Sequence, residues 1–339
     1  MGRESGESWL ERKARNGMTA REVEIAVRPS SRDESAHMIY AQLTLPTGAD
    51  PRSLQILLPG ATYSGIYWDS DFGSGQYSYV DYMVRRGHAT LNVDRLGMGR
   101  SDHPHSTKLT LESNVSVLHE IVSFARNGGL GFVPERVVTV GHSYGTLVAS
   151  RESAEFNDVD AVILTSALHS TSAAGAEAMG QKIATYVASR EPQFAGLDDG
   201  YVTSMPGTRM SMLYREGNVD PRLVELDEET KETVSLSEMA GLPQWQTDGT
   251  TGRLTVPSLI ALGDTDIVWC GPDAVDCSSA ESVLAAEMQH YPEDLQPEVF
   301  VLQQSGHDIN FQRNFEEWYA KAASWLDTVL SASVREGVA

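Results

Sequence analysis

Residues 136–150 read RVVTVGHSYGTLVAS, and this stretch decides the fold. A short run rich in β-branched residues leads into Gly-His-Ser-Tyr-Gly, which is followed by a segment with a helical pattern. A Gly-x-Ser-x-Gly sequence in this setting is typical of a nucleophile elbow, a tight strand-to-helix turn that exposes a serine hydroxyl above a sheet. We expect a side chain at Gly141 or Gly145 to strike neighbouring backbone, and Ser143 to adopt a strained conformation beneath the helix N-terminus.

The segments on either side of this stretch predict a sheet. Residues 22–27 and 37–45 alternate apolar and polar side chains, which is typical of paired antiparallel strands. The later runs are apolar throughout and indicate strands buried on both faces, at residues 54–59, 89–93, 136–140, 161–165, 258–262 and 298–302. Amphipathic patterns separate them, notably at residues 111–125 and 314–330. Strands that alternate with helices predict an α/β fold with a mainly parallel sheet and helices on both faces.

One long segment interrupts this alternation. Residues 168–252 contain no convincing strand and are too long for a loop, so we expect an inserted helical cap, or lid. The predicted organisation is an N-terminal arm at residues 1–20, a catalytic domain at residues 21–167 and 253–339, and the cap between its two parts. The cap contains Met205, Met210, Met212 and Tyr214. These residues are expected either to line a substrate channel or to pack a small helical core, and the sequence leaves both interpretations open.

The composition excludes several classes of partner. The chain of 339 residues has 26 Lys and Arg against 47 Asp and Glu, which gives a formal net charge of −21. Such an acidic protein repels phosphate groups, so we expect neither nucleic acid nor an anionic membrane surface as a partner. We expect a small-molecule substrate, and the oligomeric state is left open. The sequence shows neither a secretory signal nor an apolar span, which favours a cytoplasmic location.

The two cysteines, Cys270 and Cys277, lie close together in the chain. They are too few for a disulfide scaffold. A bridge closing this small loop is sterically allowed, but free thiols are favoured in a reducing compartment.

A serine nucleophile needs a base that is itself oriented by an acid. His307 directly follows the last predicted strand, on a loop at the carboxyl end of the sheet, where the sites of such folds gather. Another such loop, GDTD, offers Asp264 and Asp266 after the strand at residues 258–262. Among the other histidines, only His169, at the start of the cap, rivals His307 as the base.

The order Ser143, Asp266, His307 resembles the catalytic triad of the α/β-hydrolase superfamily, in its capped, esterase/lipase-like branch. GDTD is similar to the Gly-x-x-Asp of that family, which favours Asp266 over Asp264 as the acid. Residues 57–65, LLPGATYSG, resemble the family's oxyanion loop, with proline in place of the usual histidine. The resemblance implies that the backbone amides of Ala61 and Tyr144 hold the oxyanion, with Thr62 as the alternative to Ala61.

Two further segments lie near this predicted site. NVDRLGMGRSD, at residues 92–102, is similar to a family segment in which Asp94 and Arg95 are expected to tie down a loop. Near the oxyanion loop, Asp69 and Asp71 are expected either to be solvated or to contact a polar group of the substrate. An aromatic wall is expected there as well, formed by Tyr63, Tyr67, Trp68 and Phe72, and the substrate-binding set is predicted to be Tyr63 and Trp68 together with the four cap residues.

These residues predict a serine hydrolase that cleaves a carboxylic ester, lactone or thioester of a small or medium-sized organic substrate through an acyl-enzyme. We expect neither a metal ion nor a cofactor in this chemistry. The same triad would also serve acyl transfer, C–C bond cleavage or a cyclase or lyase step in small-molecule biosynthesis. A non-catalytic ligand receptor on this fold is the alternative outside enzymes, and an intact Ser, His and Asp set weighs against it.

Overall fold

The computed structural model of the protein describes residues 8–29 and 35–336 and contains an eight-stranded sheet in the order β1-β2-β4-β3-β5-β6-β9-β10. β1 pairs antiparallel with β2, and β2 pairs antiparallel with β4, whereas all other pairs are parallel. The sheet therefore confirms the predicted α/β class and all eight predicted strands. The strands are β1 (Met18–Val27), β2 (His37–Pro46), β3 (Leu54–Leu58), β4 (Ala89–Val93), β5 (Val137–His142), β6 (Ala161–Thr165), β9 (Ser258–Gly263) and β10 (Glu298–Leu302).

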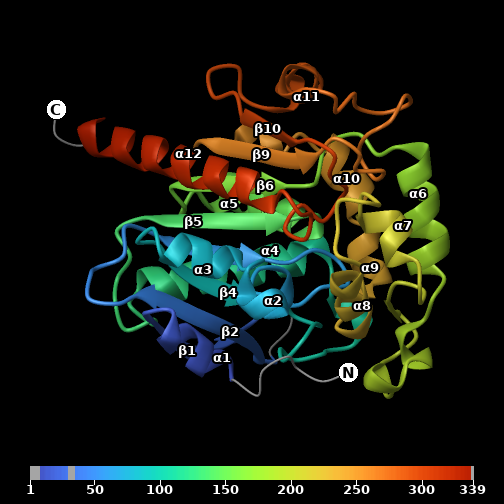
Figure 1. Cartoon of the computed structure of the whole chain (residues 1–339), viewed down its shortest axis with the longest axis horizontal. Coiled ribbons are helices and arrows are strands. Elements are labelled where there is room, and N and C mark those ends of the chain that lie inside the picture. The colour runs from blue at the N-terminus through green and yellow to red at the C-terminus, as the bar shows by residue number, and fades with distance from the viewer. Residues whose placement is uncertain (1–7, 30–34, 337–339) are drawn as a thin grey trace.

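Helices cover both faces of the sheet (Figure 1). One face packs against α4 (Leu111–Arg126) and α5 (Tyr144–Phe156), and the other against α3 (Tyr79–Val84) and α12 (Phe315–Glu336). α11 (Ala280–Glu287) lies beside β10 at the edge of the sheet. Shorter elements in the connections are α2 (Phe72–Gly75), η1 (Gly65–Tyr67), η2 (Ser106–Lys108) and η7 (Met288–His290).

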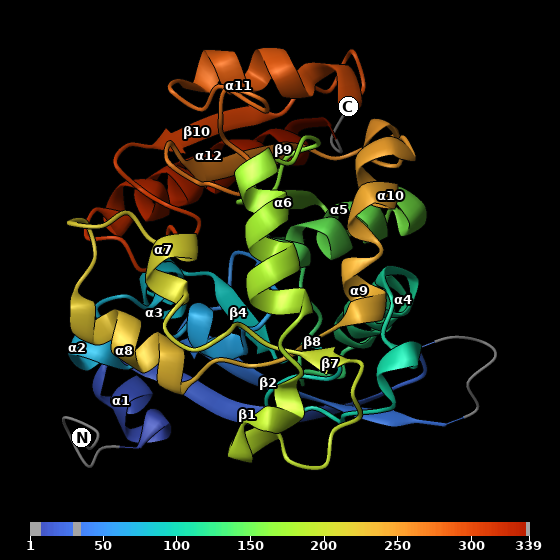
Figure 2. The same ribbon diagram turned by 90° about the vertical axis from the view of Figure 1, so that its right-hand side faces the viewer.

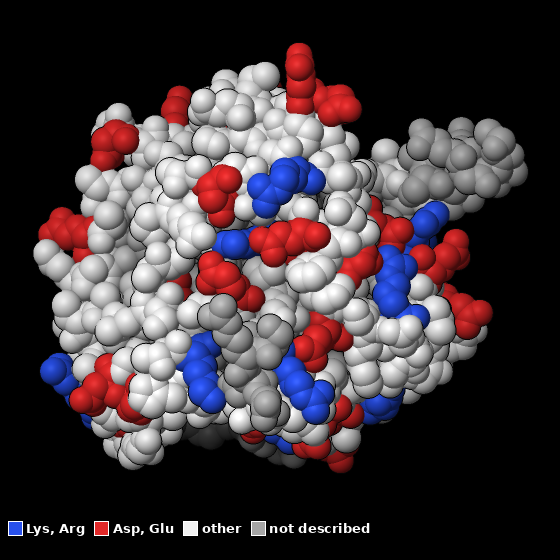
Figure 3. Space-filling view, turned by 180° about the vertical axis from the view of Figure 1, so that it is seen from behind, with Lys and Arg blue, Asp and Glu red and all other residues white. Residues whose placement is uncertain are grey.

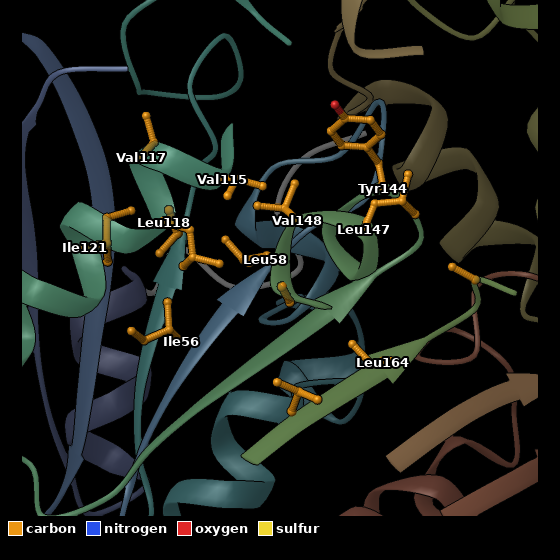
Figure 4. Close-up of a cluster of buried hydrophobic side chains, with 14 of the residues drawn as sticks. Ile56, Leu58, Val115, Val117, Leu118, Ile121, Tyr144, Leu147, Val148 and Leu164 are labelled. Atoms are coloured by element: carbon orange, nitrogen blue, oxygen red, sulfur yellow. The ribbon is translucent and has the colours of Figure 1, made fainter. Parts of the chain in front are cut away.

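The hydrophobic core is divided by the sheet into two clusters. Along β3, Ile56 and Leu58 join the cluster under α4 and α5, whereas Leu57 joins the one under α3 and α12. Successive side chains of a strand point to opposite faces, so a strand that is covered on both sides is mostly apolar on both of its faces, with few polar residues such as the buried Gln55 of β3. Figure 4 shows the first cluster, in which side chains from β3, β6, α4 and α5 meet.

The N-terminal segment forms a short helix that packs on the domain, and the first strand begins before the end of the predicted arm. β1 already begins at Met18, and α1 (Trp9–Arg15) packs beside it, while residues 1–7 lie outside the described part. Arg12 and Lys13 are almost fully buried, and each donates a hydrogen bond to Asp69 Oδ1, over 2.8 Å and 2.7 Å. Burial alone would raise the pKa of Asp69, but the charges of Lys13 and Arg12 lower it.

The expected roles of Asp69, a solvated acid or a substrate contact, are therefore both wrong. Its carboxylate is buried and its charge is neutralised by α1, so it fixes the N-terminal helix to the domain. Asp71, two residues later, is exposed to solvent, which was one of the two alternatives predicted for it.

The segment between β6 and β9 is mostly helical and lies across the end of the sheet (Figures 1 and 2). Two very short strands, β7 (Tyr201–Val202) and β8 (Val234–Ser235), pair antiparallel there, although the sequence indicated no strand. Two residues carry too little periodicity to be recognised in a sequence. The helical elements are α6 (Ala173–Met179), η3 (Gly180–Ala184), η4 (Ala188–Arg190), η5 (Pro192–Phe194), α7 (Arg209–Leu213), α8 (Pro221–Glu229), α9 (Leu236–Met239), α10 (Leu242–Thr247) and η6 (Thr251–Arg253).

Cys270 and Cys277 form a disulfide, so the preference for free thiols was wrong. A turn after β9 pairs Cys270 with Val275 and brings the two cysteine Cα atoms within 5.6 Å, a separation that a disulfide spans.

Two surface properties bear on partners. In the described part of the chain, no helix combines the length and apolar character needed to cross a bilayer. The face opposite to that of Figure 1 carries acidic and basic side chains in a mixture, without a broad basic patch (Figure 3).

Candidate active site

The turn between β5 and α5 has the conformation of a nucleophile elbow. Ser143 has φ 50° and ψ −117°, in the left-handed half of the map that residues other than glycine rarely enter. A Cβ atom on Gly141 would lie 2.3 Å from the Gly145 carbonyl oxygen, and one on Gly145 would lie 2.4 Å from the Leu58 carbonyl oxygen. Both glycines are therefore required by close backbone approaches, as the sequence predicted.

His307 and Asp266 meet at the carboxyl ends of β10 and β9. The Nδ1 atom of His307 lies 2.8 Å from Asp266 Oδ2, and both side chains are buried. Burial alone would lower the pKa of His307, but the charge of Asp266 and its hydrogen bond outweigh it, and the pKa is raised. Asp264 instead accepts a hydrogen bond from the Ser305 amide over 2.9 Å and braces the loop before His307.

A contact between His142 and His307 shows that the His307–Asp266 pair lies next to the elbow. The ring of His142, the residue before Ser143, lies 5.0 Å from the ring of His307, measured between centroids. Within the described chain, neither Ser143 Oγ nor His307 Nε2 has a hydrogen-bond partner. Catalytic hydrogen bonds are often long before substrate binds, so the arrangement leaves both reactive atoms available.

The loop after β3 approaches the elbow closely. A Cβ atom on Gly60 would lie 3.0 Å from Ser143 Cβ, so only glycine fits there without a shift. Arg95 donates from Nε to the Pro59 carbonyl over 3.0 Å and from Nη2 to the Gly60 carbonyl over 3.4 Å. The Gly60–Ala61 peptide is trans, so the Ala61 amide points away from Arg95.

The amides expected to bind an oxyanion differ in whether they are available. No described residue accepts a hydrogen bond from the N–H of Ala61 or Tyr144. The Thr62 amide, in contrast, donates to the Thr233 carbonyl over 3.3 Å, so Thr62 is excluded as the alternative donor. Arg95 also pairs with Glu238 over 2.6 Å and is buried, which fits the expected loop-fixing role.

A comparison with protein families identifies the fold. Residues 55–321 match the model of the alpha/beta hydrolase family. The chain belongs to this family. A search with the sequence found no match among curated proteins.

Solved structures of other alpha/beta hydrolases share the fold at low identity. The alpha/beta hydrolase GrgF from Penicillium sp. sh18 is 17% identical, with a TM-score of 0.61 over 92% of this chain and 98% of that one. Est1E from Butyrivibrio proteoclasticus, solved with ferulic acid, is 16% identical, with a TM-score of 0.54 over 91% and 99%. The esterase Pf2001 from Pyrococcus furiosus is 15% identical, with a TM-score of 0.54 over 96% and 98%.

In this member of the family, a buried polar cluster joins the segment between β6 and β9 to the rest of the domain beside His307. We call it the Tyr63 cluster; it consists of Tyr63, Arg209, Tyr214, Asp227 and Asp308. Arg209 donates from Nε and Nη2 to the two oxygens of Asp227, over 2.6 Å and 2.8 Å. The Tyr63 hydroxyl donates to Asp227 over 3.0 Å and also contacts Asp308, while the Tyr214 hydroxyl donates to Asp227 over 2.6 Å.

Charge within the Tyr63 cluster is not balanced. Burial raises the pKa of both Asp227 and Asp308; the charge of Arg209 opposes this rise at Asp227, and the charges of His307 and Arg209 oppose it at Asp308. Asp308 also lies 3.2 Å from Nε2 of His142, whose pKa burial holds well below its usual value. Arg209, Asp227 and Asp308 were not predicted, because no local sequence pattern marks residues that pair between distant segments.

The predicted substrate-binding residues lie in different surroundings. Trp68 is fully buried against Tyr79 and Trp318, so it is a core residue and its assignment was wrong. The hydroxyls of Tyr63 and Tyr214 belong to the Tyr63 cluster. Met212 is also buried, whereas Met205 is 37% exposed. Met210 lines a cavity of about 350 Å³ together with Gly207, Pro221, Val224, Glu225, Glu228 and Glu229.

The rival base, His169, has both ring nitrogens occupied. Nδ1 lies 2.6 Å from Glu287 Oε2, and Nε2 lies 3.0 Å from Thr251 Oγ1. The ring stacks between Trp245 and His290. His169 therefore holds the start of the segment between β6 and β9 in place, and neither of its nitrogens is free to accept a proton from a serine.

Two groups of side chains in the described residues bring metal-binding atoms together. The atoms of His142, His307 and Asp308 lie within 4.8 Å of one another, but these side chains are already joined to Asp266, Thr165 and Tyr63. The second group, His119, Glu152 and Asp158, lies on α4, on α5 and just after α5.

Proposed function

We propose that the protein is a serine hydrolase that cleaves a carboxylic ester, lactone or thioester through an acyl-enzyme. One observation carries this proposal: a strained serine at a strand-to-helix turn lies beside a buried histidine whose Nδ1 is 2.8 Å from a carboxylate. A serine hydroxyl is a poor nucleophile at neutral pH, and such a pair supplies the base that it needs.

In the proposed mechanism, Ser143 Oγ attacks the carbonyl carbon while His307 Nε2 accepts its proton. Asp266 holds the Nδ1 proton, which fixes the tautomer that leaves Nε2 free, and it stabilises the imidazolium that forms. His307 then protonates the leaving alcohol or thiol. In the second half, His307 takes a proton from water as the water attacks the acyl carbon, and it then gives this proton to Ser143 Oγ as the bond to the acyl group breaks and the free acid leaves.

The amides of Ala61 and Tyr144 are proposed to stabilise the negatively charged oxygen of each tetrahedral intermediate. Neither amide has a partner among the described residues, and Tyr144 stands at the N-terminus of α5, where the helix dipole favours negative charge. Arg95 is proposed to position the Ala61 amide through its bonds to the two preceding carbonyls.

The substrate class is supported by the nucleophile and by named relatives. Serine forms an ester that water can cleave, and two structurally similar proteins bear the name of an esterase or contain ferulic acid. Acyl transfer would share the first half of this mechanism and differ in the acceptor. Product analysis with added alcohols therefore distinguishes transfer, which yields a new ester, from hydrolysis, which yields the free acid.

The test compares Ser143→Ala with Ser74→Ala in turnover of a chromogenic ester. Ser74 also has a positive φ, of 62°, and lies between two glycines, but on an exposed turn. Ser143→Ala is expected to lose turnover by at least on the order of 10³-fold, and Ser74→Ala to keep it. Full activity of Ser143→Ala would end the serine-hydrolase proposal.

A further inference from the structure

Three metal-binding side chains meet on the face covered by α4 and α5, away from the elbow. His119 comes from α4, Glu152 from α5 and Asp158 from the turn that follows α5. His119 Nδ1 lies 2.8 Å from Asp158 Oδ2 and 3.8 Å from Glu152 Oε1. Glu152 lies roughly 12 Å along the helix axis from Tyr144, given a rise of about 1.5 Å per residue.

Glu152 is the unexplained member of this group. Its side chain is 0% exposed, and neither carboxylate oxygen has a hydrogen-bond partner among the described residues. The buried Oδ1 atom of Asp158 is likewise unpaired. A buried carboxylate that accepts no hydrogen bond is costly, so native proteins satisfy it with a proton or a cation, and the His119 ring, 3.8 Å from Glu152, is too far to donate one.

The donors are held in place by contacts outside the group. Arg126 donates from Nε and Nη2 to the Asp158 carbonyl, over 3.1 Å and 2.9 Å, which fixes the turn after α5. The ring of His119 stacks on Phe156 with centroids 3.7 Å apart. The side chains of His119 and Asp158 are 34% and 24% exposed, so an ion can reach Glu152 from solvent between them.

We propose that His119, Glu152 and Asp158 bind a divalent transition-metal ion of the Zn²⁺ type, with water completing the coordination. Bonds of about 2.0–2.1 Å at tetrahedral angles place ligand atoms about 3.3 Å apart. His119 Nδ1 lies 2.8 Å from Asp158 Oδ2 and 3.8 Å from Glu152 Oε1, on either side of this value, so small side-chain shifts suffice to coordinate an ion. One imidazole nitrogen and two carboxylates are ligands that Zn²⁺ accepts, and its charge balances theirs.

A bound ion would cross-link α4 and the end of α5, the helix whose N-terminus stands at the elbow. We assign it a structural role, because Glu152 lies two turns of helix beyond Tyr144. The rival explanation is a proton shared between Glu152 and Asp158. Burial, followed by the charge of Asp158, raises the pKa of Glu152 well above its usual value, which favours a neutral Glu152 when no ion is bound.

The test is calorimetric titration of the chelator-treated full chain with Zn²⁺. We expect saturable binding of one ion per chain at this site. Glu152→Gln and His119→Asn should each weaken it by on the order of 100-fold or more, since a lost ligand costs at least as much as a lost partner of a ligand. Glu152→Gln keeps the size of the buried side chain, and circular dichroism checks that the variant folds.

The His142, His307 and Asp308 group provides the control, because it also holds three metal-binding atoms. His307→Asn should leave the Zn²⁺ affinity of the proposed site unchanged, and bound Zn²⁺ should not prevent a fluorophosphonate from reacting with Ser143. The proposal is overturned if Zn²⁺ does not bind saturably, or if Glu152→Gln binds it as tightly as the wild type. Loss of binding in His307→Asn alone would assign the ion to the candidate active site and also overturn it.

Discussion

Two buried histidine–carboxylate pairs follow strands of the sheet, His169 after β6 and His307 after β10, and only the second leaves a nitrogen free. His307 lies 2.8 Å from Asp266, and His169 lies 2.6 Å from Glu287, both through Nδ1. Beyond this bond the two regions differ. Nε2 of His169 meets Thr251 and its ring is stacked on both sides, whereas Nε2 of His307 has no partner in the described chain.

A short histidine–acid bond therefore does not by itself mark a catalytic base. A base must keep one nitrogen within reach of a nucleophile, and the neighbouring elements decide whether it does. At His307 the closest neighbours are the elbow and the Tyr63 cluster. At His169 they are α10 and α11: the ring stacks on Trp245 of α10 and forms a hydrogen bond with Glu287 of α11.

The largest effect is expected from removing the acid of each pair. Asp266→Asn should lower kcat by roughly 10³–10⁴-fold, because an amide favours the wrong imidazole tautomer. Glu287→Gln should keep kcat and lower the free energy of unfolding by about 1–3 kcal/mol, through a weakened buried bond. Ester turnover and urea denaturation measure the two effects.

A third variant, Asp264→Asn, controls for disturbance of the loop and should cost less than about tenfold in kcat. If Glu287→Gln abolishes turnover while Asp266→Asn does not, the roles assigned to the two histidines must be exchanged. If Asp264→Asn has the larger effect of the two aspartates, Asp266 is not the acid.

A smaller loss of kcat is expected at Arg95. Arg95→Lys keeps a cation beside Glu238 but cannot contact the Pro59 and Gly60 carbonyls together, so the Ala61 amide should lose its orientation. Loss of one oxyanion donor costs about 10²–10³ in kcat, and a misaligned donor should cost roughly 10–10² with KM little changed. Arg100→Lys is the matched control, because Arg100 lies exposed in the same segment and pairs with Glu22. A rise in KM alone would contradict a positioning role for Arg95.

A change of preference rather than of rate is expected in the cap. Met210 lines the cavity beside α8, whereas Met205 is exposed, so Met210→Ala should alter the preferred chain length of ester substrates and Met205→Ala should not. A lost contact of this size is worth about 1–3 kcal/mol in kcat/KM for the best substrate. The same profile in both variants and the wild type would mean that this cavity does not receive the substrate.

The smallest effect is a shift in pH dependence. The base must be neutral to accept a proton, so kcat/KM should fall as the pH falls through the pKa of His307. Asp266 raises this pKa most, and Asp308 raises it further. Asp308→Asn removes a negative neighbour and lowers the pKa, so the acid limb should move to lower pH, whereas Asp264→Asn should leave it in place. A limb that stays or moves upward would contradict this coupling.

The sheet and the elbow follow from the sequence, because local patterns encode them. Mostly apolar runs and two alternating segments predict the eight strands, and the strands lie there. The expected burial of residues 298–302 on both faces is wrong, because β10 lies at the edge of the sheet and is partly exposed. The close approaches at Gly141 and Gly145 follow from the turn itself. His307 and Asp266 follow from their positions after parallel strands, whose carboxyl ends share one edge.

The rest depends on contacts between distant segments. The partner of Asp69 is a lysine 56 residues earlier, and Tyr63 meets Asp308 245 residues later. A tryptophan is equally suited to lining a pocket and to filling the core, so the burial of Trp68 could not be predicted from the sequence. The disulfide requires a turn that brings two Cα atoms within 5.6 Å, and spacing alone left that turn undetermined.

The most direct test of the central claim is the site and rate of reaction with a fluorophosphonate, measured by mass spectrometry of peptides from four proteins. We expect a single adduct on Ser143 in the wild type and none in Ser143→Ala. Asp266→Asn should react more slowly by roughly 10³-fold, and Glu287→Gln at the wild-type rate. An adduct on another serine, or equal rates in Asp266→Asn and the wild type, would contradict the claim that Ser143 is activated by the His307–Asp266 pair.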